Sequence, residues 1–175
     1  MAEERELWER IRRGEAQAFD AFYRGMGPHL LGFLRQIVGN RQAAEDVMQE
    51  TFTRMWRSPN GFTTERGTLR AYLFGAARKC AAEWWRKHGS AVGNPVEGRA
   101  ECKTEIASLV GDALQRLPEE QRSLLWLREV EGQSYAELAQ ILEIPVGTVR
   151  SRLFTAREEL RMVWHATRSV KKEGE

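Results

Sequence analysis

The amino-acid sequence predicts an all-α protein made of two small helical domains joined by a flexible linker. Apolar residues recur at the three- and four-residue spacing of helices, and no long stretch alternates at the two-residue period of strands. Residues 88–98 interrupt this pattern, because they hold three glycines and one proline. The 175 residues suffice for two such units. We therefore predict a first domain at 1–87, a linker at 88–105 and a second domain at 106–170.

The apolar pattern of the first domain predicts, in order, helices over 7–22, 28–38, 41–57 and 68–87. Gly14 is expected to split the first of these. Pro28 is expected to open the second, because proline suits the first turn of a helix. Gly39 and Asn40 should stop the second helix, and the turn-forming run 58–61 should stop the third. A loop then leads to the fourth helix.

The second domain is predicted to hold helices over 106–117, 119–131 and 135–143, followed by a helix that Pro145 opens. Ser134 is a suitable N-cap, and Glu137 three residues later completes a capping box. The segment 134–154 is typical of a DNA-binding helix-turn-helix, whose second helix lies in the major groove. Glu143 occupies the turn, where many such motifs have glycine; a positive φ there would cost about 1 kcal/mol.

The second helix of this motif has two distinct faces. Its inward face should be the apolar stripe Val149, Leu153, Ala156 and Leu160. Its outward face carries Gly147, Arg150, Ser151 and Phe154. Arginine can read guanine, serine can hydrogen-bond either base edge and phenylalanine can contact a thymine methyl. Three flanking residues suit phosphates, which position a protein without specifying sequence: Thr148, Arg152 and Arg157. The alternative is a solvated helix face.

Charge is segregated along the chain, although the whole carries only +2. Residues 66–87 hold six basic and one acidic side chains, a net charge of +5. Residues 145–172 hold seven basic and two acidic, again +5, whereas residues 106–144 hold three basic and seven acidic, a net −4. Two compact basic segments are a better indication of nucleic-acid binding than one.

The basic helix 68–87 also carries exposed-looking aromatic residues. Counted at 100° per residue, Leu69, Leu73, Ala76, Cys80 and Trp84 share one face and should form the core. Phe74, Arg78 and Trp85 share the opposite face. Aromatic rings beside cations suit unpaired bases, which stack on the rings while cations hold the backbone. The alternative is that Phe74 and Trp85 pack on a neighbouring helix.

An acidic and polar face precedes this helix. Asp46, Gln49, Glu50 and Thr53 lie opposite the apolar stripe of helix 41–57. They serve either solubility or docking. They do not form a convincing catalytic pair, because no histidine, metal cluster or glycine-rich phosphate loop accompanies them.

Four motifs together resemble one family. Residues 44–56 read AEDVMQETFTRMW, residues 69–78 read LRAYLFGAAR, residues 117–122 read LPEEQR and residues 145–153 read PVGTVRSRL. In this order they resemble a bacterial RNA polymerase sigma factor of the short, two-domain extracytoplasmic-function (ECF) group. Three positions depart from the usual pattern: Arg78-Lys79 stands for an Arg-Asn pair, Glu83 stands for aspartate, and Thr155 follows Phe154 where many relatives have a basic residue.

The resemblance implies a role for each face. The contact with core polymerase would use Asp46, Gln49, Glu50, Arg54 and Trp56. The melted −10 element would be held by Asn60, Arg70, Phe74, Arg78, Lys79, Trp85 and Arg86. The −35 duplex would be read by Thr148, Arg150, Ser151, Arg152, Phe154 and Arg157. The linker would thread toward the active-site cleft of the polymerase.

We therefore expect an alternative-type sigma factor that binds core polymerase, directs it to promoters and is held by an anti-sigma factor. One competing hypothesis is a stand-alone helix-turn-helix regulator, which leaves the first domain unexplained. A nucleic-acid enzyme and a protein used mainly for interaction with an inhibitor are two further alternatives.

Composition excludes several other classes. Cys80, Cys102 and the three histidines show no metal-ligand spacing, so we expect no metal, cofactor or disulfide framework. The first residues are too charged for a signal peptide, and no run approaches the roughly 18 apolar residues of a membrane span. We expect a cytoplasmic protein without membrane insertion.

Overall fold

The computed structural model describes residues 2–63, 67–89 and 113–172. These residues form helices and turns and contain no strand, which confirms the all-α prediction. Most of the predicted linker, and the predicted helix 106–117 as far as residue 112, lie outside the described residues. None of the described helices combines the length and the apolar character needed to cross a membrane.

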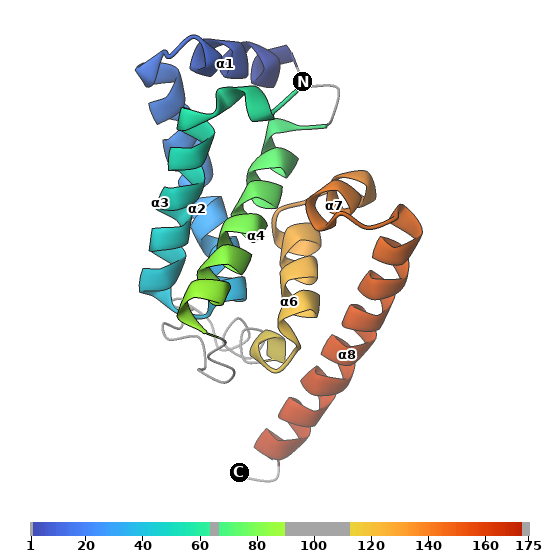
Figure 1. The fold of residues 1–175 in the computed structure, drawn as a ribbon. Coiled ribbons are helices and arrows are strands. Elements are labelled where there is room, and N and C mark those ends of the chain that lie inside the picture. Colours follow the sequence, from blue (N-terminus) through green and yellow to red (C-terminus); the bar gives the residue numbers. More distant parts are fainter. Residues whose placement is uncertain (1, 64–66, 90–112, 173–175) are drawn as a thin grey trace.

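The described part of the N-terminal half contains four α-helices and a short 3-10 turn (Pro59–Gly61); the α-helices are α1 (Ala2–Arg12), α2 (Ala16–Val38), α3 (Arg41–Arg57) and α4 (Leu69–His88). Helices α2, α3 and α4 pack side by side, and α1 lies across one end of them (Figure 1). Gly14 separates α1 from α2 as predicted, with a φ of 80° that favours glycine. Asn40 begins α3, because its side-chain oxygen accepts a hydrogen bond from Ala43 N at 3.0 Å.

The prediction that Pro28 opens a helix is wrong. Pro28 lies inside α2, which continues through it from Ala16 to Val38. A proline within a helix costs about 3 kcal/mol. Burial of large side chains on both sides of the proline, such as Phe22 and Leu30, offsets this cost, because each contributes about 1.5–3 kcal/mol.

The C-terminal half consists of α6 (Glu119–Leu125), a π-helical turn (Trp126–Val130), α7 (Tyr135–Leu142) and α8 (Val146–Lys172). The predicted capping box is confirmed: the Ser134 hydroxyl accepts from Glu137 N, and the Glu137 carboxylate accepts from Ser134 N. Glu143 ends α7 in the left-handed region, with φ 56° and ψ 41°. Helices α7 and α8 thus form the expected helix-turn-helix.

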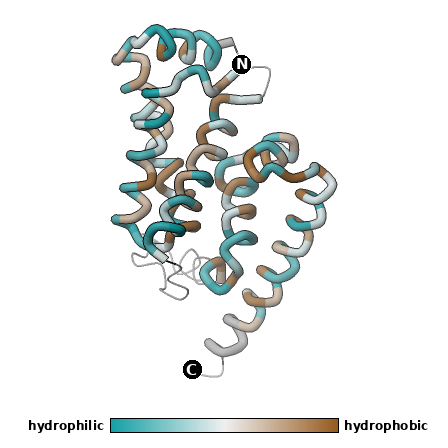
Figure 2. The backbone as a smooth tube through the Cα atoms, in the orientation of Figure 1, coloured by the Kyte–Doolittle hydropathy of each residue, from teal (hydrophilic) through white to brown (hydrophobic). Residues whose placement is uncertain are grey.

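The two halves pack against each other along two contacts. Helix α4 lies on α7 (Figure 1), and α2 contacts α6. The buried side chains of both halves form one continuous cluster. Hydrophobic and hydrophilic residues alternate along the helices, as amphipathic packing requires (Figure 2). The sequence pattern had predicted two helical units but not that they share a core.

Candidate nucleic-acid interface

The outward face of α8 is open to solvent. On its opposite, apolar side Val149, Leu153 and Ala156 are fully buried, and Leu160, the fourth residue of the predicted stripe, is half-buried. Arg150 and Ser151 are exposed, and Phe154 is 68% exposed. A large aromatic ring on the free side of a firmly anchored helix is unusual for a plain surface. This face is therefore available to a partner.

The residues that flank this face already have partners within the C-terminal half. Arg157 Nη2 lies 2.7 Å from Glu129 Oε1, and Arg152 Nη1 lies 3.8 Å from Glu120 Oε2. Both pairs are exposed, so they contribute little to stability and phosphates can replace the carboxylates. The third flanking residue, Thr148, is half-buried and its carbonyl accepts from Ser151 Oγ at 3.0 Å.

The prediction that Phe74 is exposed is wrong. Its ring has 0% exposure and meets Phe33 of α2 edge-on, with centroids 5.1 Å apart. The Arg70 guanidinium lies 5.9 Å from the Phe74 ring centroid. The angular count placed Phe74 away from the buried Leu73 and Cys80, but α2 packs against it there through Phe33. In this conformation Phe74 packs in the core and is out of reach of bases.

Three cations predicted for the −10 element are engaged by the C-terminal half. Arg70 pairs with the carboxylate of Glu131. Arg78 Nη1 donates to the main-chain carbonyl of Ile141 at 2.9 Å, at the last turn of α7. Lys79 Nζ lies 2.6 Å from Glu143 Oε1. The structure thus brings these cations together, but against α7 and its flanking turns.

The other residues predicted for the −10 element lie apart from α7. Trp85 is half-buried and meets Trp84 edge-on at 5.0 Å, and Arg86 is exposed in the last turn of α4. Asn60 is exposed in the turn after α3, where its Oδ1 accepts from Arg12 Nε at 3.3 Å. These three remain accessible from solvent.

Glu131 was missed by the sequence reasoning. It is only 6% exposed, and its Oε2 contacts both Arg70 and His29 Nδ1, the latter at 3.0 Å. Its Oε1 accepts from Trp126 Nε1 at 3.2 Å. No local motif marks this glutamate; the only signal was the acidic charge of segment 106–144 opposite the basic charge of segment 66–87.

The predicted polymerase-binding face of α3 is exposed. Asp46, Gln49 and Glu50 point away from the core. Arg54 bridges α3 and α4, because it donates at 2.6 Å both to Glu50 and to Glu83. The hydrogen bonds that Arg54 donates to Glu83, and then to Glu50, raise the pKa of Arg54, and the bond from Arg54 lowers the pKa of Glu83. This face is therefore held in a fixed arrangement of charges.

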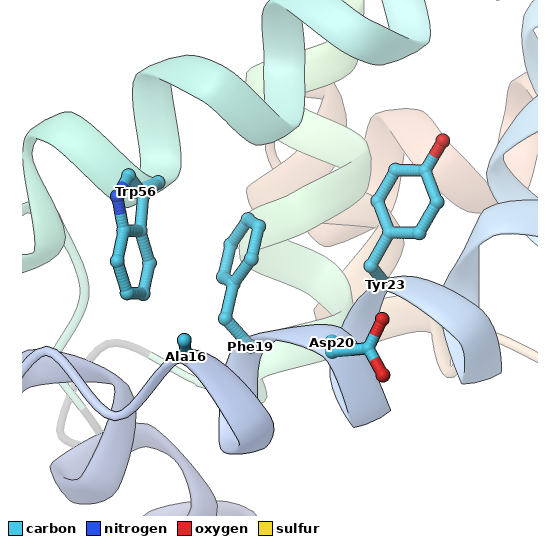
Figure 3. A pocket seen from close by; sticks show the side chains of 5 residues that line it. All are labelled: Ala16, Phe19, Asp20, Tyr23 and Trp56. Atoms are coloured by element: carbon cyan, nitrogen blue, oxygen red, sulfur yellow. The ribbon is translucent and has the colours of Figure 1, made fainter.

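Trp56 borders an open hollow of about 340 Å³ near the end of α3 (Figure 3). It is 38% exposed and lies 4.8 Å from the Phe19 ring. Tyr23 and Asp20 complete the hollow with Ala16. Aromatic walls beside a carboxylate suit an apolar or cationic side chain of another protein. In the described part of the chain, no three His, Cys, Asp or Glu residues are grouped as metal ligands would be.

Two family comparisons match the two halves of the chain. Residues 22–91 match the family described as Sigma-70 region 2, and residues 107–160 match Sigma-70 region 4. The chain is 32% identical to the RNA polymerase sigma-H factor of Pseudomonas aeruginosa, over 90% of this chain and 92% of that protein. It is 31% identical to the ECF RNA polymerase sigma-E factor of Haemophilus influenzae, over 87% and 90% of the two chains.

Two solved structures have a similar fold. CnrH, solved in complex with the cytosolic domain of CnrY, superposes with a TM-score of 0.73 at 24% identity, over 93% of this chain and 97% of that chain. The sigma factor RpoE of Bartonella quintana, solved with the anti-sigma factor NepR, gives a TM-score of 0.71 at 24% identity, over 85% and 97%. Both likenesses support the helical fold.

Proposed function

The chain belongs to the ECF group of the sigma-70 family of RNA polymerase sigma factors. We propose that its two halves bind different parts of the transcription machinery. As a sigma factor it directs RNA polymerase to promoters. The C-terminal half reads the −35 duplex with α8. The N-terminal half binds core polymerase through α3 and captures the melted −10 strand with α4 and the loop before it. Its part in initiation is binding, and we propose no catalytic step for it.

The observation that carries this assignment is the outward face of α8. Arg150, Ser151 and Phe154 are exposed on a helix whose opposite side is anchored by buried Val149, Leu153 and Ala156. Such a helix can enter the major groove without rearrangement of its own domain. Arginine, serine and phenylalanine together can contact guanine, either base edge and a thymine methyl.

The decisive experiment is transcription in vitro with core polymerase across a genomic promoter library, with the start sites mapped. We expect initiation at sites that share one −35 and one −10 motif. If core polymerase and this protein start no transcript at any promoter, the proposed function is wrong.

Arg150→Ala tests the −35 assignment in the same assay. Loss of one bidentate contact costs about 1–3 kcal/mol of base discrimination, so the mapped −35 motif should relax at one position. Arg161→Ala is the matched control, because Arg161 is an exposed α8 arginine that pairs with Glu158 at 3.0 Å and lies eleven residues, about 16 Å, along the helix from Arg150. An intact −35 motif in Arg150→Ala would refute the assignment.

Asp46→Ala and Glu50→Ala test the polymerase face. Each should weaken binding to core polymerase and leave the mapped promoter motifs unchanged, because neither residue is assigned to DNA. Glu45→Ala is the control on the same helix, since Glu45 is engaged by Arg41 at 2.8 Å. A shift of the promoter motifs would contradict the assignment of Asp46 and Glu50 to polymerase binding alone.

We also propose that an anti-sigma factor regulates the protein. Support comes from the Bartonella relative, which was solved with such a factor. Isolation of the native protein from cells should recover polymerase subunits in one pool and an inhibitor in another. Recovery of polymerase alone, under all growth conditions tested, would contradict the proposal.

A further inference from the structure

We propose that in the free protein the C-terminal half occupies the −10-binding face of α4, and so competes with single-stranded DNA, while the −35 face of α8 stays open. This inference rests on the proposed function for the identity of the α4 face. It adds a regulatory state: one DNA reader is covered and the other is not. The contact between α4 and α7, with their flanking turns, is called the seam below.

The anions at the seam come from the protein itself. Glu131 engages Arg70, Glu143 engages Lys79, and the Ile141 carbonyl accepts from Arg78. At the start of α4, Thr68 Oγ1 donates to the Glu137 carboxylate at 2.8 Å. Three carboxylates and a helix-terminal carbonyl therefore occupy the polar groups of α4 that we assign to phosphates. The same cations cannot make both sets of contacts.

The charge pattern of the sequence fits this arrangement. The segment 66–87, which contains α4, carries +5, and the segment 106–144, which contains α6 and α7, carries −4. A strongly basic face is attracted to any polyanion, including an acidic surface on its own chain. The acidic segment lies on the basic one in the folded protein.

The backbones at the seam leave no room for a base. Gly75 faces α7, and a Cβ added to it would lie 3.8 Å from Ile141 Cα, which is ordinary contact distance. Phe74 next to it is completely buried. The Phe74 ring contacts Phe33 of α2. The surface that α7 itself covers is therefore the one at Gly75 and Arg78, which a DNA strand could reach only after α7 has moved away.

The −35 face differs in this respect. Arg150 and Phe154 lie on the outward side of α8, away from the seam, and both are exposed. The closed protein can therefore contact duplex DNA with α8 without opening. We expect duplex binding and single-strand binding to respond differently when the seam is broken.

The exposed ion pair of the seam contributes little to its closure. The Lys79 and Glu143 side chains are each about two-thirds exposed, and such pairs contribute little. Glu131 is the exception, because it is buried and contacts Arg70, His29 and Trp126. Removal of Glu131 leaves the Arg70 cation and the Trp126 N–H without their partner, which favours the open state.

The test compares Glu131→Ala/Glu143→Ala with wild type and with Glu9→Ala/Glu158→Ala. The control removes the same charge and breaks two exposed pairs that lie within single helices, to Arg12 and Arg161. Small-angle X-ray scattering of the full chain reports opening as a larger radius of gyration. We expect opening in the seam variant only.

Fluorescence anisotropy then measures DNA binding with two probes, a randomised 12-nucleotide single strand and a randomised 20-base-pair duplex, both labelled with fluorescein. The seam variant should bind the single strand at least about fivefold more tightly than the control, which is the value of one stacked base. Its affinity for the duplex should match that of the control. An unchanged duplex affinity would show that the tighter single-strand binding comes from the uncovering of α4 and not from the loss of two negative charges.

A second variant closes the seam covalently. Gly75→Cys/Ile141→Cys, in a Cys102→Ser background, places two thiols at the close approach of α4 and α7, within reach of a disulfide. The oxidised protein should bind the single strand more weakly than the reduced protein, and reductant should restore binding. Duplex affinity should be the same in both forms.

Either of two results would overturn the proposal. One is a wild-type radius of gyration as large as that of the seam variant, which would mean that the free protein is already open. The other is single-strand affinity that is unchanged by opening and by the disulfide. Neither result touches the proposed function, which is judged by transcription with core polymerase and can stand while the seam inference fails.

Discussion

At the scale of single residues, Glu143 combines a local cost with a long-range contact. Its φ of 56° places it in the left-handed region, and it is the only described residue other than glycine with a positive φ. A side chain at such a position costs about 1 kcal/mol relative to glycine. In exchange, this turn of the helix-turn-helix carries a carboxylate that reaches Lys79 on α4.

Comparison of Glu143→Gly with Glu143→Ala separates these two contributions. Both variants lose the pair with Lys79, but only glycine relieves the backbone. The free energy of unfolding should therefore be about 1 kcal/mol higher for Glu143→Gly than for Glu143→Ala. Urea denaturation measures the difference. Equal stabilities would show that the turn relaxes without cost in the alanine variant.

The same residue gives a prediction for pH. A hydrogen bond from Lys79, followed by its positive charge, lowers the pKa of the Glu143 carboxyl below its ordinary value. The pair therefore stabilises the folded protein fully above the ordinary glutamate pKa, and this stabilisation is lost as pH falls through the lowered value. In Lys79→Met, carbon-13 NMR titration should find the pKa of Glu143 raised toward normal. An unchanged pKa would exclude the ion pair in solution.

At the scale of elements, α7 depends on its first turn. It has eight residues, too few for a helix to be stable by propensity alone, and its start is fixed by Ser134 and Glu137. The Glu137 carboxylate also accepts from Thr68 on the N-terminal half. The cap thus stabilises both the helix and its position against α4.

Ser134→Ala should lower the free energy of unfolding by about 1 kcal/mol, because it leaves the Glu137 N–H without its partner. Chemical denaturation followed by circular dichroism is the measurement. Ser151→Ala on the exposed face of α8 is the control and should change stability by less than about 0.5 kcal/mol. A cap variant as stable as the control would mean that α7 is held by packing alone.

The elements also show what the sequence could and could not predict. The capping box and the burial of Val149, Leu153 and Ala156 on α8 depend on neighbours in the chain, so local pattern predicted them. Pro28 and Phe74 depend on packing from elsewhere in the molecule. Periodicity gave the correct side of α4 for Phe74, but it carries no information about which element covers that side. For the same reason, periodicity did not indicate that Glu131 contacts Arg70 and His29 of the N-terminal half.

At the scale of the whole molecule, the two halves share one hydrophobic cluster. Two independent domains on a linker would each unfold on their own. A shared core instead couples them, so unfolding of the wild-type chain should be a single cooperative transition by both circular dichroism and tryptophan fluorescence.

Gly32→Leu should break this coupling. Gly32 lies on α2 facing the C-terminal half, and a Cβ there would already lie 3.0 Å from Trp126 Cζ2. A whole leucine side chain does not fit unless the indole, and the π-helical turn that carries it, moves away. We expect the two spectroscopic transitions to separate, since each half then unfolds alone. Gly25→Leu is the matched control, because it adds the same side chain to α2 where no atom lies within 4 Å. That variant should keep one transition. Coincident transitions in Gly32→Leu would mean that the halves are coupled by contacts other than the one between α2 and Trp126.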